Sequence, residues 1–197
     1  MSAFEFFFSF YGLVLGLSVV EIVAGVGRMV DEGHRLKVGW LTPLLAAFLG
    51  LDIASFWISA WAQYQHAPLN YALLILGLVI AGLYYIAAYL VFPRHPADGA
   101  VLDDHYWTHR RLILGGVFLA NLLNKLVAVS MLQAAGILSW GDVIWPAVFY
   151  SLLALAIGLP RGRMAAGALV LVLMLSIAAV AQSAVALINT PVWAFGS

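Results

Sequence analysis

Long apolar stretches alternate with short polar ones along nearly the whole chain. Each apolar stretch has about 20 residues, which is the length that a helix needs to cross a hydrocarbon layer of ~30 Å. The pattern predicts six membrane-spanning helices, over residues 4–27, 40–62, 71–92, 112–132, 143–159 and 165–188. The polar segments between them are too short to form a further domain. We therefore expect one all-α transmembrane domain over residues 1–197, folded as a six-helix bundle.

The composition agrees with this class of protein. Of the 197 residues, 64% are hydrophobic and 9% are charged, which is typical of an integral membrane protein whose main partner is the lipid bilayer. The chain has no cysteine, so disulfides, thiolate metal sites and thiol redox chemistry are excluded. Its net charge is zero, and no basic tail or stripe indicates binding to nucleic acid. We expect no bound cofactor.

The basic residues predict how the bundle is oriented. Eight of the nine lie in or beside the first, third and fifth connections: Arg28, Arg35, Lys37, Arg94, Arg110, Arg111, Arg161 and Arg163. Connections rich in Lys and Arg stay in the cytoplasm. We therefore expect a multi-pass protein of the bacterial cytoplasmic membrane, with the N and C termini outside, in the periplasm.

A short similarity suggests that the two halves of the chain are related. Residues 13–16 (LVLG) resemble residues 112–115 (LILG), and in each half a proline, Pro43 or Pro146, lies near the start of the next helix. Two halves of three helices would have opposite topology, as in many transporters. Such short apolar matches also arise by chance, so two inverted three-helix repeats and a bundle without repeats both stay open.

The fourth apolar segment carries polar side chains near its middle, namely Asn121, Asn124 and Lys125. An ammonium group at that depth costs roughly 3 kcal/mol on insertion scales. The spacings of three and four residues place all three side chains on one helical face. We expect this face to be buried inside the bundle rather than exposed to lipid.

The second apolar segment carries Asp52 about 18 Å from its predicted cytoplasmic start, and Lys125 lies about 20 Å from the same side. Their similar depth predicts an ion pair between Asp52 and Lys125, with hydrogen bonds from Asn121 and Asn124 offsetting the cost of desolvation. Such a pair serves either as a static clip that fixes the register of the helices or as a gate, proton site or substrate site.

Three further polar residues follow Asp52 at spacings of three, four and four: Ser55, Ser59 and Gln63. These spacings predict a polar stripe along one face of the helix. The stripe would form a path from the middle of the membrane to its outer side.

Glu21 is a second carboxyl well inside an apolar segment, about 9 Å from the predicted cytoplasmic edge. One amine cannot neutralise two carboxylates, which leaves Glu21 either without a cation or paired with Arg28. A carboxyl in a low dielectric without a cation takes up and releases protons near neutral pH. Glu21 is therefore the first candidate for proton coupling, and a pair with Arg28 at the membrane rim is the alternative.

The third connection contains a possible metal-ligand set. His105 and His109 are four residues apart, so on a helix they would share one face with a nearby carboxylate such as Asp104. We favour the alternative, in which Asp103 or Asp104 caps the helix and the aromatic and basic residues lie among the headgroups. The sequence therefore predicts no metal site.

Two classes of function fit these features. The first is a small transporter or an ion- or proton-conducting protein whose path lies among the first, second and fourth helices, because intramembrane ionisable residues mark such paths. The second is a structural or accessory subunit of a larger membrane complex, in which the buried charges fix helix packing. Either one fits assembly with further copies of the chain or with other membrane subunits. A membrane enzyme is the least supported class, because the sequence has none of the common catalytic motifs.

Overall fold

The computed structural model describes residues 3–33, 35–37, 39–64 and 70–189, without the side chains of residues 3, 4, 6 and 184–189. Within these residues the chain forms six helices, each long and apolar enough to cross a membrane. They are α1 (Ala3–Asp31), α2 (Leu41–Tyr64), α3 (Tyr71–Val91), α4 (Leu102–Ala134), α5 (Gly141–Gly158) and α6 (Arg163–Asn189). The predicted all-α, multi-pass membrane protein is confirmed. The orientation in the membrane and the inverted repeat stay predictions.

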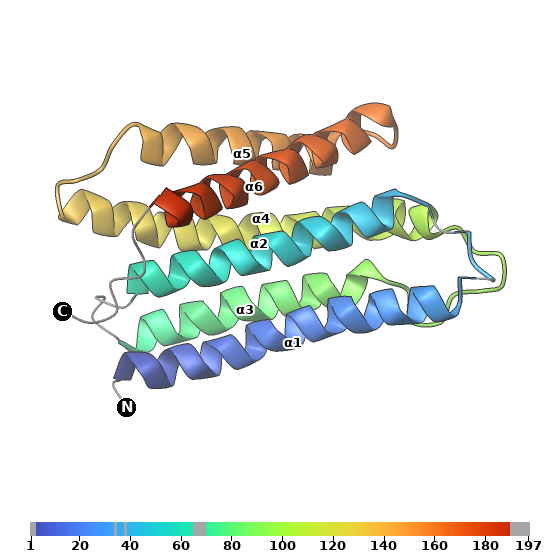
Figure 1. The fold of residues 1–197 in the computed structure, drawn as a ribbon, viewed down its shortest axis with the longest axis horizontal. Coiled ribbons are helices and arrows are strands. Elements are labelled where there is room, and N and C mark those ends of the chain that lie inside the picture. The colour runs from blue at the N-terminus through green and yellow to red at the C-terminus, as the bar shows by residue number, and fades with distance from the viewer. Residues whose placement is uncertain (1–2, 34, 38, 65–69, 190–197) are drawn as a thin grey trace.

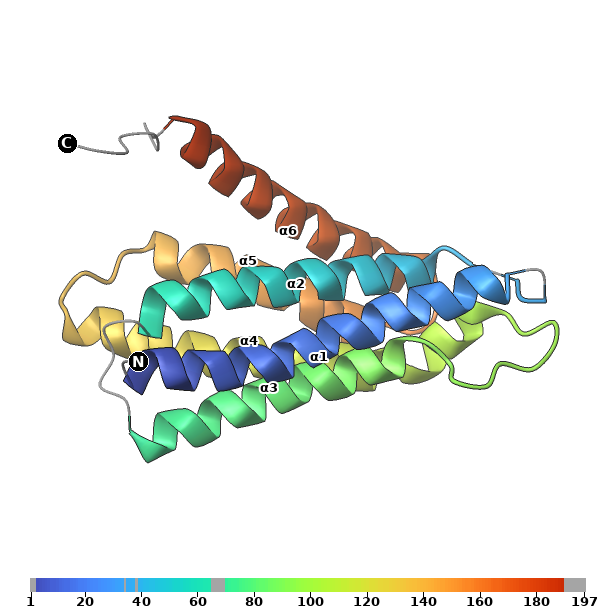
Figure 2. The same ribbon diagram turned by 60° about the horizontal axis from the view of Figure 1, so that its bottom comes forward.

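The helices form one bundle with α2 and α4 in its middle (Figure 1). On one side α1 packs against α2 and α3, and on the other side α5 packs against α4 and α6. The first helix begins and the sixth ends at the same end of the bundle, which we call the terminal end. Figure 2 shows α6 leaving the other helices as it approaches this end.

The fourth helix differs most from its prediction. It begins at Leu102 rather than at residue 112, and thus includes the polar segment before the apolar run. Its first turn is tied to the start of α2. The Leu41 amide donates to Asp103 Oδ1 at 3.0 Å, and the Thr42 hydroxyl donates to the Leu102 carbonyl at 2.9 Å. A Cβ on Gly39 would lie 2.0 Å from Cγ of Asp103, so a larger residue there would displace the Asp103 carboxylate.

These contacts correct the predicted cap. Asp103 satisfies the first turn of α2, where the backbone N–H groups have no partner within their own helix. The N-cap of α4 itself is Val101, whose side chain makes no capping hydrogen bond. The first turn of α4 therefore holds the start of α2.

Arg110 lies inside the bundle, although the sequence suggests a basic residue at the membrane surface. It is only 3% exposed, and its guanidinium donates to the carbonyls of Ala156 (2.8 Å) and Leu159, which end α5. Carbonyls at a helix C-terminus lack partners within their helix, and a cation there also interacts favourably with the helix dipole. Arg110 thus fixes the end of α5 against α4.

Candidate functional site

The buried polar centre of the bundle is Asp52, at the middle of α2. Its side chain is 6% exposed, and its Oδ2 atom accepts two hydrogen bonds. One comes from the Tyr84 hydroxyl of α3 at 2.8 Å, and the other comes from the Asn121 amide of α4 at 2.8 Å. Both donors are neutral groups. The carboxyl is therefore held by dipoles from two other helices rather than by a cation.

The three side chains form a closed triangle, because the Asn121 amide also donates to the Tyr84 oxygen at 3.0 Å. The same amide contacts the Val117 carbonyl at 3.1 Å, one turn back on α4. Tyr84 is fully buried, and its ring packs against that of Phe56 with centroids 5.2 Å apart. This packing fixes the hydroxyl on Asp52 Oδ2.

Two more tyrosines extend the polar centre to further helices. Tyr150 of α5 donates to the Asn121 carbonyl at 3.0 Å. One turn along α4 from Asn121, the Asn124 side-chain oxygen accepts a 2.7 Å hydrogen bond from Tyr64, at the end of α2. The polar centre thus joins α2, α3, α4 and α5 by side chains in the interior of the bundle.

The predicted ion pair between Asp52 and Lys125 is wrong. Within the part of the chain that the structure describes, no ion pair is formed by either residue. The half-buried Lys125 is instead close enough to Asp142 of α5 to interact with it electrostatically. Successive helical residues are about 100° apart, so Asn124 and Lys125 leave α4 on opposite sides of Asn121. Asn124 reaches α2, whereas Lys125 points to α5.

The predicted path along α2 is also not continuous. Ser59 is exposed on the outer face of the bundle, and its hydroxyl donates to the Phe56 carbonyl of its own helix at 2.9 Å. The buried line that follows Asp52 runs instead through Phe56, Ala60 and Tyr64. Of the predicted stripe, Ser55 and Gln63 are half-buried. Steps of three and of four residues both stay near one side of a helix, so the spacing from Asp52 allows either line of residues to face inward. In the structure the line with Phe56 and Tyr64 faces the interior.

Glu21 pairs with Arg94, in the connection after α3, rather than with Arg28. The Arg94 guanidinium lies 3.2 Å from Oε1 and 3.3 Å from Oε2. Arg94 also lies over the Tyr89 ring, 4.0 Å from its centroid. The Glu21 side chain is 21% exposed and that of Arg94 is 44% exposed. Neither predicted environment of Glu21 is found.

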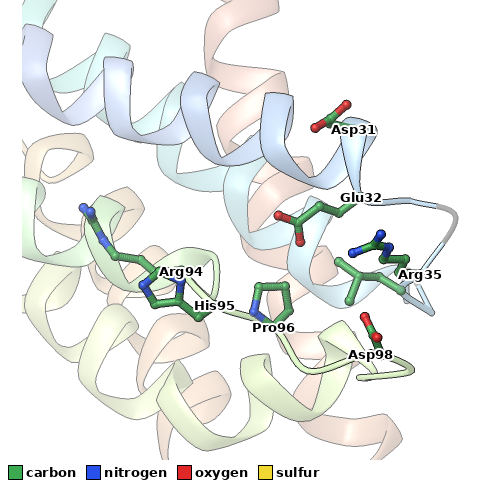
Figure 3. A pocket seen from close by; sticks show the side chains of 8 residues that line it. Asp31, Glu32, Arg35, Arg94, His95, Pro96 and Asp98 are labelled. Carbon is green, nitrogen blue, oxygen red and sulfur yellow. The ribbon is translucent and has the colours of Figure 1, made fainter.

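Arg94 also borders a polar cavity of about 460 Å³ at the end of the bundle opposite the terminal end (Figure 3). The cavity is lined by side chains of both charges, among them Glu32, Arg35 and Asp98. Figure 3 shows the Arg94 guanidinium directed away from Asp98, which agrees with its pairing to Glu21. Acids and bases are mixed around the cavity, so its charge selects neither anions nor cations.

The possible metal set is not assembled: the His105 and His109 rings lie side by side, with centroids 4.2 Å apart, but Asp104 does not join them. His105 Nε2 lies 2.9 Å from the Leu90 carbonyl, and His109 Nδ1 lies 3.1 Å from the His105 carbonyl. Asp104 pairs with Arg161 of the connection between α5 and α6. Among the described residues, no group of three or more His, Cys, Asp or Glu side chains is placed to hold a metal ion.

Comparison with known proteins gives no further guide to this site. No protein-family model matches the chain, and no curated protein or solved structure is significantly similar to it. We therefore interpret the site from its own geometry.

The sequence missed the tyrosines. Tyr84 and Tyr150 lie in predicted membrane helices and Tyr64 follows the end of one, and all three bind polar residues that the sequence did identify. A buried tyrosine needs a hydrogen-bond partner for its hydroxyl. A tyrosine well inside an apolar segment is therefore a signal that the interior contains such a partner. Spacing alone does not tell Tyr84, which is buried, from its half-buried neighbour Tyr85.

Proposed function

We propose that the protein is a small membrane transporter or proton-conducting protein in which Asp52 binds and releases the transported or coupled proton. The observation that carries this proposal is a carboxyl at the centre of a membrane bundle whose partners are neutral hydrogen-bond donors. Ionisable residues inside membrane domains are rare, and they commonly mark ion pathways or proton relays. Glu21 is a weaker candidate because Arg94 already neutralises it.

The geometry suits a group that changes its protonation state. When Asp52 is ionised, the hydroxyl of Tyr84 and the amide of Asn121 stabilise the carboxylate by charge-assisted hydrogen bonds. When Asp52 is protonated, the acid proton is itself a donor, and the Tyr84 hydroxyl can turn to accept it. Both states keep their hydrogen bonds, so exchange of a proton does not require the bundle to unfold locally.

Coupling to transport follows from the number of helices that meet at Asp52. Hydrogen bonds to Asp52 connect α2 with α3 and α4, and Tyr150 connects Asn121 with α5. Loss of the negative charge weakens the first two of these contacts, because hydrogen bonds to charged groups are about twice as strong as neutral ones. Protonation thus changes how firmly α2 is held against α3 and α4, which is the kind of bias that an alternating-access motion needs.

The experiment is an Asp52→Asn variant reconstituted in proteoliposomes. Proton flux driven by an imposed membrane potential is followed with an internal pH-sensitive dye. We expect a loss of at least about tenfold, because Asn cannot exchange the proton. Infrared difference spectra over a pH titration should show a carboxylic-acid band that Asp52→Asn removes. The matched control is Asp31→Asn, at an exposed carboxyl. Unchanged flux together with an unchanged band in Asp52→Asn would overturn the proposal.

A structural or accessory subunit is the second candidate. It is favoured by the closed hydrogen bonding around Asp52 and by the apolar side chains that α5 leaves exposed, among them Trp145 and Val148. In that case α5 would contact another copy of the chain or another membrane subunit. Purification from the native membrane in mild detergent tests this alternative. A partner at fixed stoichiometry, together with normal assembly of Asp52→Asn, would favour the subunit over the transporter.

A further inference from the structure

An apolar groove of about 560 Å³ lies between the last turns of α1 and the first turns of α2. Both sets of turns are at the end of the bundle opposite the terminal end (Figure 1). The back of the groove is formed by buried side chains, namely Ile22 and Met29 of α1 and Phe92, which follows α3. The Phe92 ring packs directly on α1, because a Cβ on Gly25 would lie 2.2 Å from its Cδ2 atom. The side chains that α2 contributes are small: Pro43, Ala46 and Ala47.

The groove opens to the surroundings of the bundle. On its rim Val26 is 45% exposed, Val30 is 77% exposed, and Ala47 is also exposed. Both helices are long and apolar enough to span a membrane, and a hydrocarbon layer contains no water to fill such a groove. Lining atoms without neighbours lose their dispersion contacts. Ile22 and Val30 are about 12 Å apart along the helix, so a long, apolar occupant fits best.

A basic and an aromatic side chain lie at the mouth of the groove. Leu102 lines the groove, and its backbone N–H donates to the Lys37 carbonyl at 3.2 Å. The Lys37 side chain is exposed, and no ion pair holds it among the described residues. Trp40 is 56% exposed and lies three residues before Pro43, on the same side of the helix. Tryptophan is enriched where a membrane meets water.

The nearby acids are engaged elsewhere. Asp31 and Glu32, at the end of α1, line the polar cavity of Figure 3 and not the groove. Asp103 follows Leu102, and its carboxylate accepts a hydrogen bond from the Leu41 amide. The charge left at the mouth of the groove is therefore the ammonium group of Lys37.

We propose that the groove binds one acyl chain of an anionic phospholipid, whose phosphate lies beside Lys37 and Trp40. The hydrocarbon layer itself supplies an occupant of the required shape. An acyl chain is as apolar in the bilayer as in the groove, so packing holds the chain, and the charge of Lys37 selects the headgroup. Asp52 does not line the groove, so this inference is independent of the function proposed above.

The first test measures lipid retention by native mass spectrometry of the whole chain. The chain is released from detergent micelles that contain phosphatidylglycerol or phosphatidylcholine with the same acyl chains. We expect one phosphatidylglycerol per chain. Ala47→Phe should lower its retention at least about fivefold, because the ring takes the space of the chain and removes many dispersion contacts. The matched control is Ala54→Phe, at an exposed alanine seven residues further along α2. Unchanged retention in Ala47→Phe would overturn the proposal.

A second variant fills the groove from its other wall. Val26→Phe should also lower retention, whereas Val23→Phe, at a 64% exposed valine outside the groove, should not. This pair decides the proposal if Ala47→Phe does not fold. The same spectra show the oligomeric state. A dimer that Ala47→Phe dissociates would show that a second copy covers the groove, and would overturn the lipid site.

The headgroup contact is tested separately. Lys37→Gln should lower the retention of phosphatidylglycerol about fivefold and leave that of phosphatidylcholine unchanged. Arg163→Gln removes another exposed cation near the same end of the bundle and should change neither. Equal retention of the two lipids by the parent chain, or equal effects of the two substitutions, would overturn the proposed contact with Lys37.

Discussion

Two of the carboxyls in the membrane helices lie away from the helix ends, Asp52 and Glu21, and they have opposite surroundings. Asp52 is 6% exposed at the middle of α2 and is held by the neutral donors Tyr84 and Asn121. Glu21 is 21% exposed on α1 and is paired with Arg94, which comes from a connection at the end of the bundle. One carboxyl is deep and without a cation, whereas the other is shallow and neutralised.

The difference indicates which of the two carboxyls can change its protonation state. An ion pair fixes a carboxylate in its charged form, because the cation favours that form. Neutral donors that can rotate serve both protonation states, so Asp52 can exchange a proton without losing all its partners. Arg110 is a buried cation whose charge is likewise stabilised by fixed partners, the carbonyls at the end of α5. The residue in the least neutralised surroundings is therefore the best functional candidate.

The largest expected effect comes from removing the carboxyl at the deep site. Asp52→Leu leaves the donors of Tyr84 and Asn121 without their acceptor and should lower the free energy of unfolding by about 2–4 kcal/mol. Adding Tyr84→Phe and Asn121→Leu should recover most of that loss, because no buried donor then remains unsatisfied. Unfolding in mixed micelles, followed by circular dichroism, measures both. A single variant as stable as the parent chain would contradict the hydrogen bonding described above.

A smaller effect is expected at the shallow site. Glu21→Gln removes an ion pair whose two side chains are partly exposed, so the loss should stay below about 1 kcal/mol. Proton flux should persist, in contrast to its loss in Asp52→Asn. The same unfolding and proteoliposome measurements apply. Flux abolished by Glu21→Gln and retained by Asp52→Asn would reverse the comparison between the two carboxyls.

The smallest effect is expected at Lys125. Because its amine forms no ion pair with Asp52, Lys125→Met should change the free energy of unfolding by no more than about 0.5 kcal/mol. Arg110→Met is the contrasting control, since it leaves the last carbonyls of α5 without a donor and should destabilise the protein clearly. Equal effects of the two substitutions would show that Lys125 is held as firmly as Arg110.

Part of the site was predictable from the sequence. Asp52 and Asn121 stand out as polar residues deep in apolar segments, and Asn121 does bind Asp52 as expected. The mistaken partner, Lys125, came from matching charge and depth alone. Depth along a helix says nothing of direction around its axis, and one residue of difference turns a side chain by about 100°. Because of that rotation, Asn124 accepts a hydrogen bond from Tyr64 of α2, whereas Lys125 lies on the side of α4 that faces α5.

The sequence by itself determined the helices, their number within the described chain and their membrane-spanning character. It does so because lipid offers no hydrogen bonds, and an apolar segment of about 20 residues satisfies its own backbone as a helix. Only the tertiary structure decided which polar groups meet. Helix packing selects one face among several that the spacing allows, and bulky rings such as that of Phe56 occupy the interior in place of Ser59. The partners of Asp52, Glu21 and Arg110 follow from that choice, since each partner belongs to a helix or connection that is distant in the chain.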